Sequence, residues 1–258
     1  MRIAVKVGTS TLAHATGRLN IRRVEALCTV LSDLKNAGHE IILISSGAIG
    51  LGVGKLGLGQ RPSDLAGKQA AAAVGQCELM YTYDRLFGQY SHVTAQLLLT
   101  WEDFTHSERS AHLRNTLRKL LDLGALPIIN ENDAVATEEI SVGDNDTLGA
   151  LVAIAVQADL LVLLSDIDGL YTADPRANPG AQLIHEVHVI DEAVKALAGG
   201  SGSQLGTGGM ATKVHAAELT CAQGIDLIIA QGAKPELLYD IADGKPVGTR
   251  FVSGGKAQ

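Results

Sequence analysis

The sequence predicts an α/β fold, a three-layer α/β/α sandwich around a mainly parallel sheet, and two observations carry this prediction. Hydrophobic residues make up 46% of the chain but aromatic residues only 3%, so the core must be built from Ala, Val, Leu and Ile. Short β-branched runs also alternate with longer helical patterns along the whole chain. Such alternation is typical of parallel strands joined by crossover helices.

The expected strands follow one another without a convincing linker or internal repeat, so we expect a single domain over residues 1–258. They are RIAVKV, EIILIS, HVTAQLLL, ALPIIN, LLVLLSD and IDLIIA, with TRFV as a final edge strand. The first long helix has Asn20 as its N-cap and Gly38 just past its end. Its expected buried stripe is Val24, Leu27, Val30, Leu31 and Leu34. A later helix runs from about Gly209 to Gln223.

The charge and the cysteines exclude several classes of protein. A net charge of -7 without any run of Lys or Arg argues against a general nucleic-acid binder. No stretch is long and apolar enough to span a membrane and the N-terminus has no signal-peptide pattern, so we expect a cytoplasmic protein. Cys28, Cys77 and Cys221 have no metal-binding spacing, and we expect buried free thiols.

Polar residues follow the expected strands at the edge where ligands gather in open parallel sheets. Lys6 lies inside the first strand between Val5 and Val7, shortly before Gly8-Thr9-Ser10. It is either a lysine reaching out from the sheet or a fixed cation for phosphate oxygens. Ser46 and the glycine after it follow the second strand, where they could cap a helix or bind an anion.

Two acidic clusters stand after later strands. Glu131 and Asp133 form the first, and Asp144 and Asp146 flank Asn145 at the start of a helix in the second. Capping explains one of these acids. The others suit a ligand with an ammonium group, or a divalent ion carried by a nucleotide.

Two glycine motifs resemble known phosphate-binding patterns without fitting them. GTGGMATK, residues 206–213, lacks the glycine before the lysine and the hydroxyl after it that a P-loop requires. Gly52-Val-Gly54-Lys-Leu-Gly57 fits the dinucleotide fingerprint in letters, but it does not directly follow a strand. We expect it to form a glycine-rich loop covering a site.

Taken together, the motifs identify a family. KVGTS, SSGAI, KQAAAAVGQ, INENDAVATEEI, VGDNDTLGA, SDIDGLYTADPR and LGTGGMATK occur in this order over nearly the whole chain. In this combination the chain resembles the amino-acid kinase family, and within it the glutamate 5-kinases. The resemblance implies ATP-dependent phosphorylation of the side-chain carboxylate of L-glutamate to L-glutamyl 5-phosphate, the first step of proline biosynthesis, with Mg²⁺.

The resemblance also implies roles for individual residues. Ser46, Asp133 and Asn145 would bind glutamate, and Asp146 would be an acid that holds the lysines in place. ATP would be bound by Lys6, Ser165, Asp166, Thr207, Gly208, Gly209, Met210, Ala211, Thr212 and Lys213. The catalytic residues would be Lys6, Lys213 and Asp146.

The resemblance further implies a homo-oligomer, a dimer or tetramer, and inhibition by proline through the segment from Trp101 to Asn115. Many members continue into a C-terminal PUA domain, whereas this sequence stops soon after VGTRFV and resembles the form with a catalytic domain alone. Three alternatives stay open. The chain could be a kinase of the same fold acting on N-acetylglutamate, aspartate or UMP, an NAD-dependent oxidoreductase built on Gly52, Gly54 and Gly57, or a non-catalytic amino-acid sensor.

Overall fold

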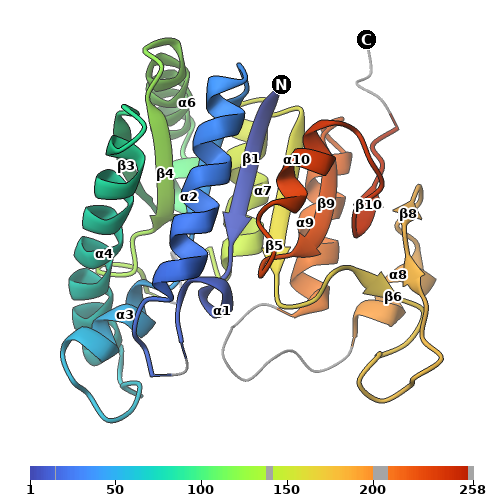
Figure 1. Cartoon of the computed structure of the whole chain (residues 1–258), viewed down its shortest axis with the longest axis horizontal. Helices are drawn as coiled ribbons and strands as arrows, with labels where there is room; N and C mark the ends of the chain where they lie inside the picture. The colour runs from blue at the N-terminus through green and yellow to red at the C-terminus, as the bar shows by residue number, and fades with distance from the viewer. Residues whose placement is uncertain (15, 138–141, 200–208, 255–258) are drawn as a thin grey trace.

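The computed structural model describes residues 1–14, 16–137, 142–199 and 209–254, and the central sheet dominates it (Figure 1). In this part of the chain eight strands form one sheet in the order β3-β4-β2-β1-β5-β9-β10-β8. Six of these are the predicted strands: β1 (Arg2–Val7), β2 (Glu40–Ser45), β3 (Thr94–Leu99), β4 (Leu126–Glu131), β5 (Leu160–Ser165) and β9 (Asp226–Gln231). All neighbours among the six pair in parallel, which confirms the predicted α/β fold.

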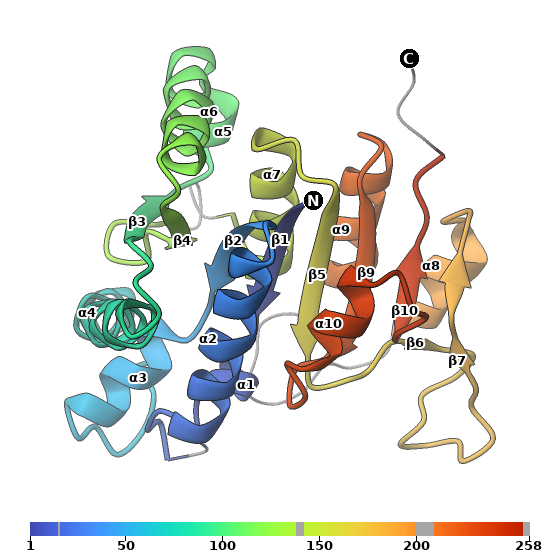
Figure 2. The ribbon, with the colours of Figure 1, turned by 45° about the horizontal axis from the view of Figure 1, so that its top comes forward.

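Helices cover both faces of the sheet and complete three layers. One face carries α1 (Thr9–Leu12), α2 (Ile21–Asn36), α3 (Ala48–Lys55), α4 (Leu65–Gly88) and α10 (Leu237–Ala242). The other carries α5 (Glu102–Thr105), α6 (Ser107–Asp122), α7 (Asn145–Ala155), α8 (Glu192–Ala198) and α9 (Met210–Cys221). Figure 2 shows α2 and α10 on the near side of the sheet, with α7 and α9 behind it.

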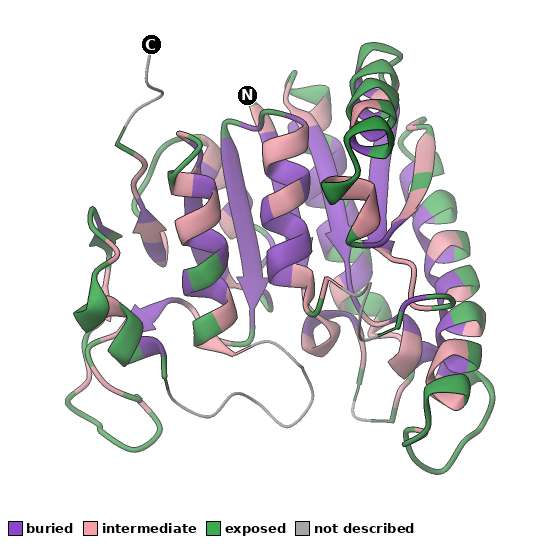
Figure 3. Ribbon diagram, turned by 180° about the vertical axis from the view of Figure 1, so that it is seen from behind, coloured by how far each residue is buried: buried purple, intermediate pink, exposed green. Residues whose placement is uncertain are grey.

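The alternation of side chains along the strands gives each face its own core. In β1, Ile3, Val5 and Val7 belong to the core under α2, whereas Ala4 belongs to the core under α7 and α9. Figure 3 shows the central strands as buried. Because successive side chains in a strand point to opposite faces, Lys6 lies on the same side as Ala4, toward α7 and α9.

The predicted boundaries of α2 are confirmed. The side chain of Asn20 accepts a hydrogen bond from the backbone N–H of Arg23 at 3.2 Å. Gly38 adopts a φ of 95°, the left-handed conformation that glycine accepts most readily after a helix. The whole predicted apolar stripe is buried beneath the helix.

The C-terminal edge of the sheet differs from the prediction. β10 (Thr249–Phe251) is not an edge strand, because it lies between β9, to which it is antiparallel, and β8 (Glu186–Val187). Two further short strands, β6 (Leu170–Tyr171) and β7 (Leu183–Ile184), pair with each other outside the main sheet. Strands of two residues are too short to produce a periodic pattern in the sequence.

The prediction of buried cysteines is correct for Cys28 but wrong for Cys77, which is exposed, while Cys221 is half-buried. All three thiols are free. On α4 the buried side is formed by residues such as Ala72, Gln76 and Leu79, and Cys77 falls outside this stripe. The many alanines of α4 hide the stripe, since Ala occurs on either side of a helix.

The glycine-rich segment after β2 is helical at its first two glycines and not the predicted loop, whereas Gly57 lies in the connection after the helix, and residues 58–61 of that connection line a cavity. Gly52 and Gly54 lie inside α3, which packs closely on α4. A β-carbon on Gly52 would lie 1.8 Å from the carbonyl oxygen of Ala71, and one on Gly75 would lie 1.8 Å from the carbonyl oxygen of Ala48. These glycines therefore serve helix packing, which removes the structural basis for a dinucleotide fingerprint. No helix in the described ranges has the length and apolar character needed to cross a membrane.

Candidate active site

A cavity of about 510 Å³ lies at the carboxyl ends of the central strands, the edge at which the sequence predicts a ligand. It is lined from the ends of β1, β2, β4 and β5 and from the starts of α3 and α7. Its lining includes Lys6, Ser46, Asp133, Asn145, Asp146, Ser165, Asp166 and Lys213. A groove of about 740 Å³ between α4 and β3 contains only one predicted site residue, Asp133, which also lines the cavity.

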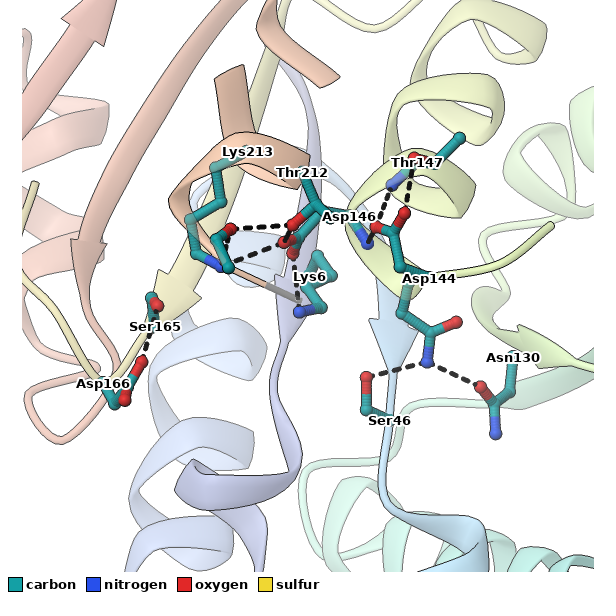
Figure 4. A network of polar contacts seen from close by, with 12 residues as sticks. Lys6, Ser46, Asn130, Asp144, Asp146, Thr147, Ser165, Asp166, Thr212 and Lys213 are labelled. Atoms are coloured by element: carbon teal, nitrogen blue, oxygen red, sulfur yellow. Dashed lines mark hydrogen bonds and ion pairs between the residues drawn. The ribbon is translucent and has the colours of Figure 1, made fainter. Parts of the chain in front are cut away.

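Two lysines from distant parts of the chain meet at one carboxylate in this cavity (Figure 4). Lys6 Nζ lies 2.7 Å from Oδ1 of Asp146, and Lys213 Nζ lies 2.9 Å from Oδ2. The side chain of Asp146 is 1% exposed, and those of Lys6 and Lys213 are 11% and 6% exposed. The arrangement leaves a net charge of +1 at a nearly dry site.

Each of the three residues is placed by its own element. Lys6 lies near the end of β1 over α7, where Gly149 leaves room: a β-carbon there would lie 3.5 Å from Cβ of Lys6. Asp146 lies in the first turn of α7, and Lys213 in the first turn of α9. The two helices lie side by side on the same face, so their first turns both reach the end of β1.

The N-terminus of α7 is held by Asp144. Oδ1 of Asp144 accepts hydrogen bonds from the backbone N–H groups of Asp146 and Thr147, both at 2.9 Å, and Oδ2 accepts from the hydroxyl of Thr147 at 2.8 Å. Asp144 is therefore the acid that capping explains.

The lysines keep Asp146 ionised. Burial alone would raise the pKa of its carboxyl group, but the charges of Lys6 and Lys213 outweigh burial and hold that pKa well below its ordinary value. An ionised Asp146 can keep both ammonium groups in place until a more highly charged anion enters.

Besides the two lysines, the residues predicted to bind the nucleotide come from two segments, residues 165–166 and 207–212. Ser165 and Asp166 line the cavity at the end of β5, and the hydroxyl of Ser165 donates to Oδ1 of Asp166 at 3.1 Å. Gly209 is the N-cap of α9, so the predicted helix-opening role of GTGGMATK holds at this residue. Thr207 and Gly208 lie outside the described residues.

The remaining residues of that motif start α9. Met210 and Ala211 lie in the first turn of the helix without lining the cavity. Thr212 Oγ1 lies 2.8 Å from Oδ2 of Asp146, the same oxygen that Lys213 contacts. The hydroxyl group of Thr212 thus donates a hydrogen bond to the carboxylate that pairs with both lysines. The sequence did not predict this contact.

The other end of the cavity carries a chain of polar side chains. The Nδ2 group of Asn145 donates to the hydroxyl oxygen of Ser46 at 2.7 Å and to Oδ1 of Asn130 at 3.1 Å. Asn130 in turn donates from Nδ2 to Oε1 of Gln76 at 2.9 Å. Oδ1 of Asn145 is buried, and no hydrogen-bond partner for it exists among the described residues. A buried acceptor of this kind is suited to a donor group on a ligand.

Asp133 stands at the same end. Burial and the neighbouring charge of Glu131 raise the pKa of Asp133 to about 6, although Arg61 acts in the opposite direction. Oε1 of Glu131 accepts a hydrogen bond from the backbone N–H of Val142 at 2.6 Å. Asp133 is therefore ionised at neutral pH, at a cost that a cationic ligand would offset.

Sequence reasoning missed three polar residues of this region. Asn130 and Gln76 lie within INENDAV and KQAAAAVGQ, which identify the family but do not show that the two side chains meet. Arg61 lines the cavity from the segment between α3 and α4. No spacing rule predicts that a surface loop brings its arginine across to a strand end.

Comparison with known proteins decides the family. The model of the amino acid kinase family matches residues 1–231. The chain belongs to the amino acid kinase family. Among its relatives are the glutamate 5-kinase of Clostridium acetobutylicum, 51% identical over 99% of this chain and 96% of the relative, and that of Clostridium perfringens, 50% identical over 98% and 95%.

Solved structures of two other kinases share the fold at low sequence identity. Carbamate kinase from Giardia lamblia bound to AMP-PNP superposes with a TM-score of 0.68 at 20% identity and covers 98% of each chain. UMP kinase from Ureaplasma parvum superposes with a TM-score of 0.66 at 15% identity, over 97% of this chain and 98% of that one. These similarities confirm the fold of an amino acid kinase.

Proposed function

We propose that this chain is a glutamate 5-kinase in one catalytic domain, which transfers the γ-phosphoryl group of ATP to the side-chain carboxylate of L-glutamate and so starts proline biosynthesis. The observation that carries the proposal is the convergence of Lys6 and Lys213 on Asp146 inside one cavity. The relatives named glutamate 5-kinase, about half identical over nearly the full chain, support the choice of acceptor.

The chemistry requires charge neutralisation more than proton transfer. The γ-carboxyl group of glutamate has a reference pKa of about 4.3 and is already ionised at neutral pH, so the reaction needs no general base. A carboxylate oxygen bonds to the γ-phosphorus, the bond from that phosphorus to the β–γ bridging oxygen breaks, and ADP leaves with the electron pair. Both reactants are anions, and the two ammonium groups reduce their repulsion.

Mg²⁺ is the remaining charge that such a transfer uses, and it neutralises phosphate oxygens when bound. Among the described residues no group of three or more His, Cys, Asp or Glu side chains could hold a metal ion. We therefore expect the ion to arrive on the phosphates of ATP and to keep most of its water ligands.

Asp133 and Asn145 suit the α-ammonium group of the acceptor. The carboxylate of Asp133, with a pKa of about 6, would be stabilised by a cationic donor. The same donor would give a hydrogen bond to the buried Oδ1 of Asn145, which has no partner among the described residues. N-acetylglutamate and UMP carry no ammonium group, and this part of the cavity therefore favours a free amino acid.

The test is release of ADP with hydroxylamine present to trap the labile acyl phosphate. We expect release with L-glutamate and much slower release with aspartate, N-acetylglutamate or UMP. ADP release with one of the other acceptors and none with glutamate would reject the proposal in favour of a related kinase.

Three further expectations rest on the resemblance alone. We propose that the enzyme works in the cytoplasm, that it forms a dimer or tetramer, and that proline inhibits it. The segment from Trp101 to Asn115 forms α5 and the first half of α6, and none of its residues lines the cavity. Inhibition through this segment would therefore act from outside the cavity. Unchanged activity at saturating proline, or a monomer in light scattering, would contradict the respective expectation.

A further inference from the structure

The cavity contains one arginine that the proposed reaction does not yet use. Among the described residues its Lys and Arg side chains are Lys6, Arg61 and Lys213. Lys6 and Lys213 pair with Asp146. Within the described ranges Arg61 makes no ion pair and no hydrogen bond from its side chain, and the residue is exposed. It is therefore a cation at the cavity wall that is free to bind a ligand.

Arg61 is carried by a short segment whose end is anchored. The segment 56–64 joins α3 to α4, and Asp64 caps α4 by accepting a hydrogen bond from the backbone N–H of Gly67 at 2.7 Å. Pro62 packs close to the same glycine, since its Cβ would lie 2.7 Å from a β-carbon on Gly67. Arg61 thus lies at the fixed end of the segment, close in sequence to the first turn of α4.

The arginine acts on the acceptor end of the cavity. The charge of Arg61 affects the carboxyl group of Asp133. Burial and Glu131 raise the pKa of Asp133, and the charge of Arg61 lowers it. Arg61 and the carboxylates of Glu131, Asp133 and Asp144 line the same cavity.

The charged groups of the acceptor, glutamate, can be matched to the side chains that line the cavity. Glutamate has two carboxylates and one ammonium group at neutral pH. Its γ-carboxylate must lie near Lys6, and its ammonium group suits Asp133 and Asn145. The α-carboxylate then lies beside acidic side chains and needs a cation of its own.

We infer that Arg61 binds the α-carboxylate of the amino-acid acceptor. The inference rests on the proposed function and adds to it the residue that selects an α-amino acid. An arginine suits this task because its planar guanidinium can form two parallel hydrogen bonds with a carboxylate.

The order of groups along the cavity agrees with this inference. Gly47, the N-cap of α3, lies close to Thr9 at the start of α1, since a β-carbon on Gly47 would lie 3.6 Å from Cγ2 of Thr9. The same turn after β1 reaches Lys6, since a β-carbon on Gly8 would lie 3.8 Å from Lys6 Nζ. The backbone N–H groups at the start of α3 therefore suit the γ-carboxylate. Asp133 lines the cavity together with Arg61, at the end where the ammonium and α-carboxylate groups of glutamate would lie.

The test compares L-glutamate with L-isoglutamine, in which a neutral amide replaces the α-carboxylate. Wild-type enzyme should use L-glutamate with a kcat/KM roughly 10- to 100-fold higher than that for L-isoglutamine, as expected for a charge-assisted bidentate contact. In Arg61→Gln the KM for glutamate should rise by a similar factor, and the preference over L-isoglutamine should fall to within about threefold. The KM for ATP should stay within about twofold, because the substitution leaves the two lysines proposed to bind ATP unchanged.

The control is Lys55→Gln, which removes a nearby positive charge outside the cavity. Lys55 pairs with Glu78 on α4 and does not line the cavity. This variant should keep the preference for glutamate. A preference that persists in Arg61→Gln, or an equal loss with both acceptors, would overturn the role of Arg61. Absence of glutamate-dependent ADP release in the wild type would instead reject the proposed function itself.

Discussion

At the scale of single residues, the site depends on one carboxylate that serves three partners. Asp146 contacts Lys6 through Oδ1 and both Lys213 and Thr212 through Oδ2. A buried ion pair is weak evidence for stability, because desolvation offsets the Coulomb attraction. We propose instead a functional reason for the arrangement: it would keep two cations together in the absence of the anionic reactants.

The Asp146→Asn variant should therefore unfold more easily when no nucleotide is present. Removing the carboxylate leaves two buried ammonium groups without their counterion, which costs about 3–5 kcal/mol. ATP supplies negative charge to the same groups, so it should raise the melting temperature of the variant more than that of the wild type. Thermal unfolding with and without ATP measures this, and equal shifts in both proteins would argue against phosphates replacing the carboxylate.

Asp133 should give the reaction a pH dependence on its acid side. The pKa of Asp133 is raised to about 6, so the carboxylate that accepts from the ammonium group is lost as the pH falls through that value. The kcat/KM for glutamate should drop below about pH 6 because it reports groups of the free enzyme. Asp133→Asn should raise the KM for glutamate more than that for ATP and remove this limb of the profile. An unchanged KM for glutamate would reject the assignment.

Ionised Asp133 should favour glutamate binding, but it should lower the stability of the fold. Because the folded-state pKa is raised, protonation of Asp133 stabilises the fold, fully below the ordinary pKa of 3.8 and no longer above about pH 6. At pH 8 the wild type thus carries a half-buried charge that Asp133→Asn lacks. The variant should melt at a higher temperature than the wild type at pH 8. A lower melting temperature would contradict the cost assigned to this charge.

At the scale of elements, the helices α3 and α4 set the position of the acceptor end. Their contact is so close that Gly52 and Gly75 leave no room for a β-carbon. The sequence shows these glycines, but a spacing of glycines does not distinguish a phosphate-binding turn from a helix contact. Whether these glycines form a turn or a helix contact depends on α4, which packs against α3 but lies further along the chain.

Gly75→Ala should consequently destabilise the fold and disturb the site. Its β-carbon would lie 1.8 Å from the carbonyl oxygen of Ala48, and overpacking of this kind costs about 1–3 kcal/mol or more. The start of α3 would shift, and the KM for glutamate should rise. Gly88→Ala in the same helix is the matched control, since a β-carbon there meets nothing within 4 Å. It should be neutral or stabilising by up to about 1 kcal/mol. Denaturant unfolding of both variants tests this, and equal effects would contradict the packing account.

At the scale of the whole molecule, the sheet order brings the site together. β1 lies between β2 and β5, so the residues after these strands share one edge. The sequence predicts the six main strands and the chemistry at their ends, because each of these is a local pattern. It does not predict that Lys6, Asp146 and Lys213 share two oxygen atoms, because that depends on how α7 and α9 pack on β1. The contact of Thr212 was missed for the same reason, and Arg61 was missed because the position of the segment between α3 and α4 also depends on tertiary packing.

The most direct measurement is the turnover of Lys213→Ala with saturating ATP and glutamate, together with its melting temperature. A cation about 4 Å from a phosphate oxygen contributes about 4 kcal/mol at an effective dielectric near 20, which is roughly a thousandfold in rate. We predict a loss of turnover by about two orders of magnitude or more, with the fold intact because Asp146 keeps its contact with Lys6. Turnover within a few-fold of the wild type would contradict the account that two lysines neutralise the reacting anions.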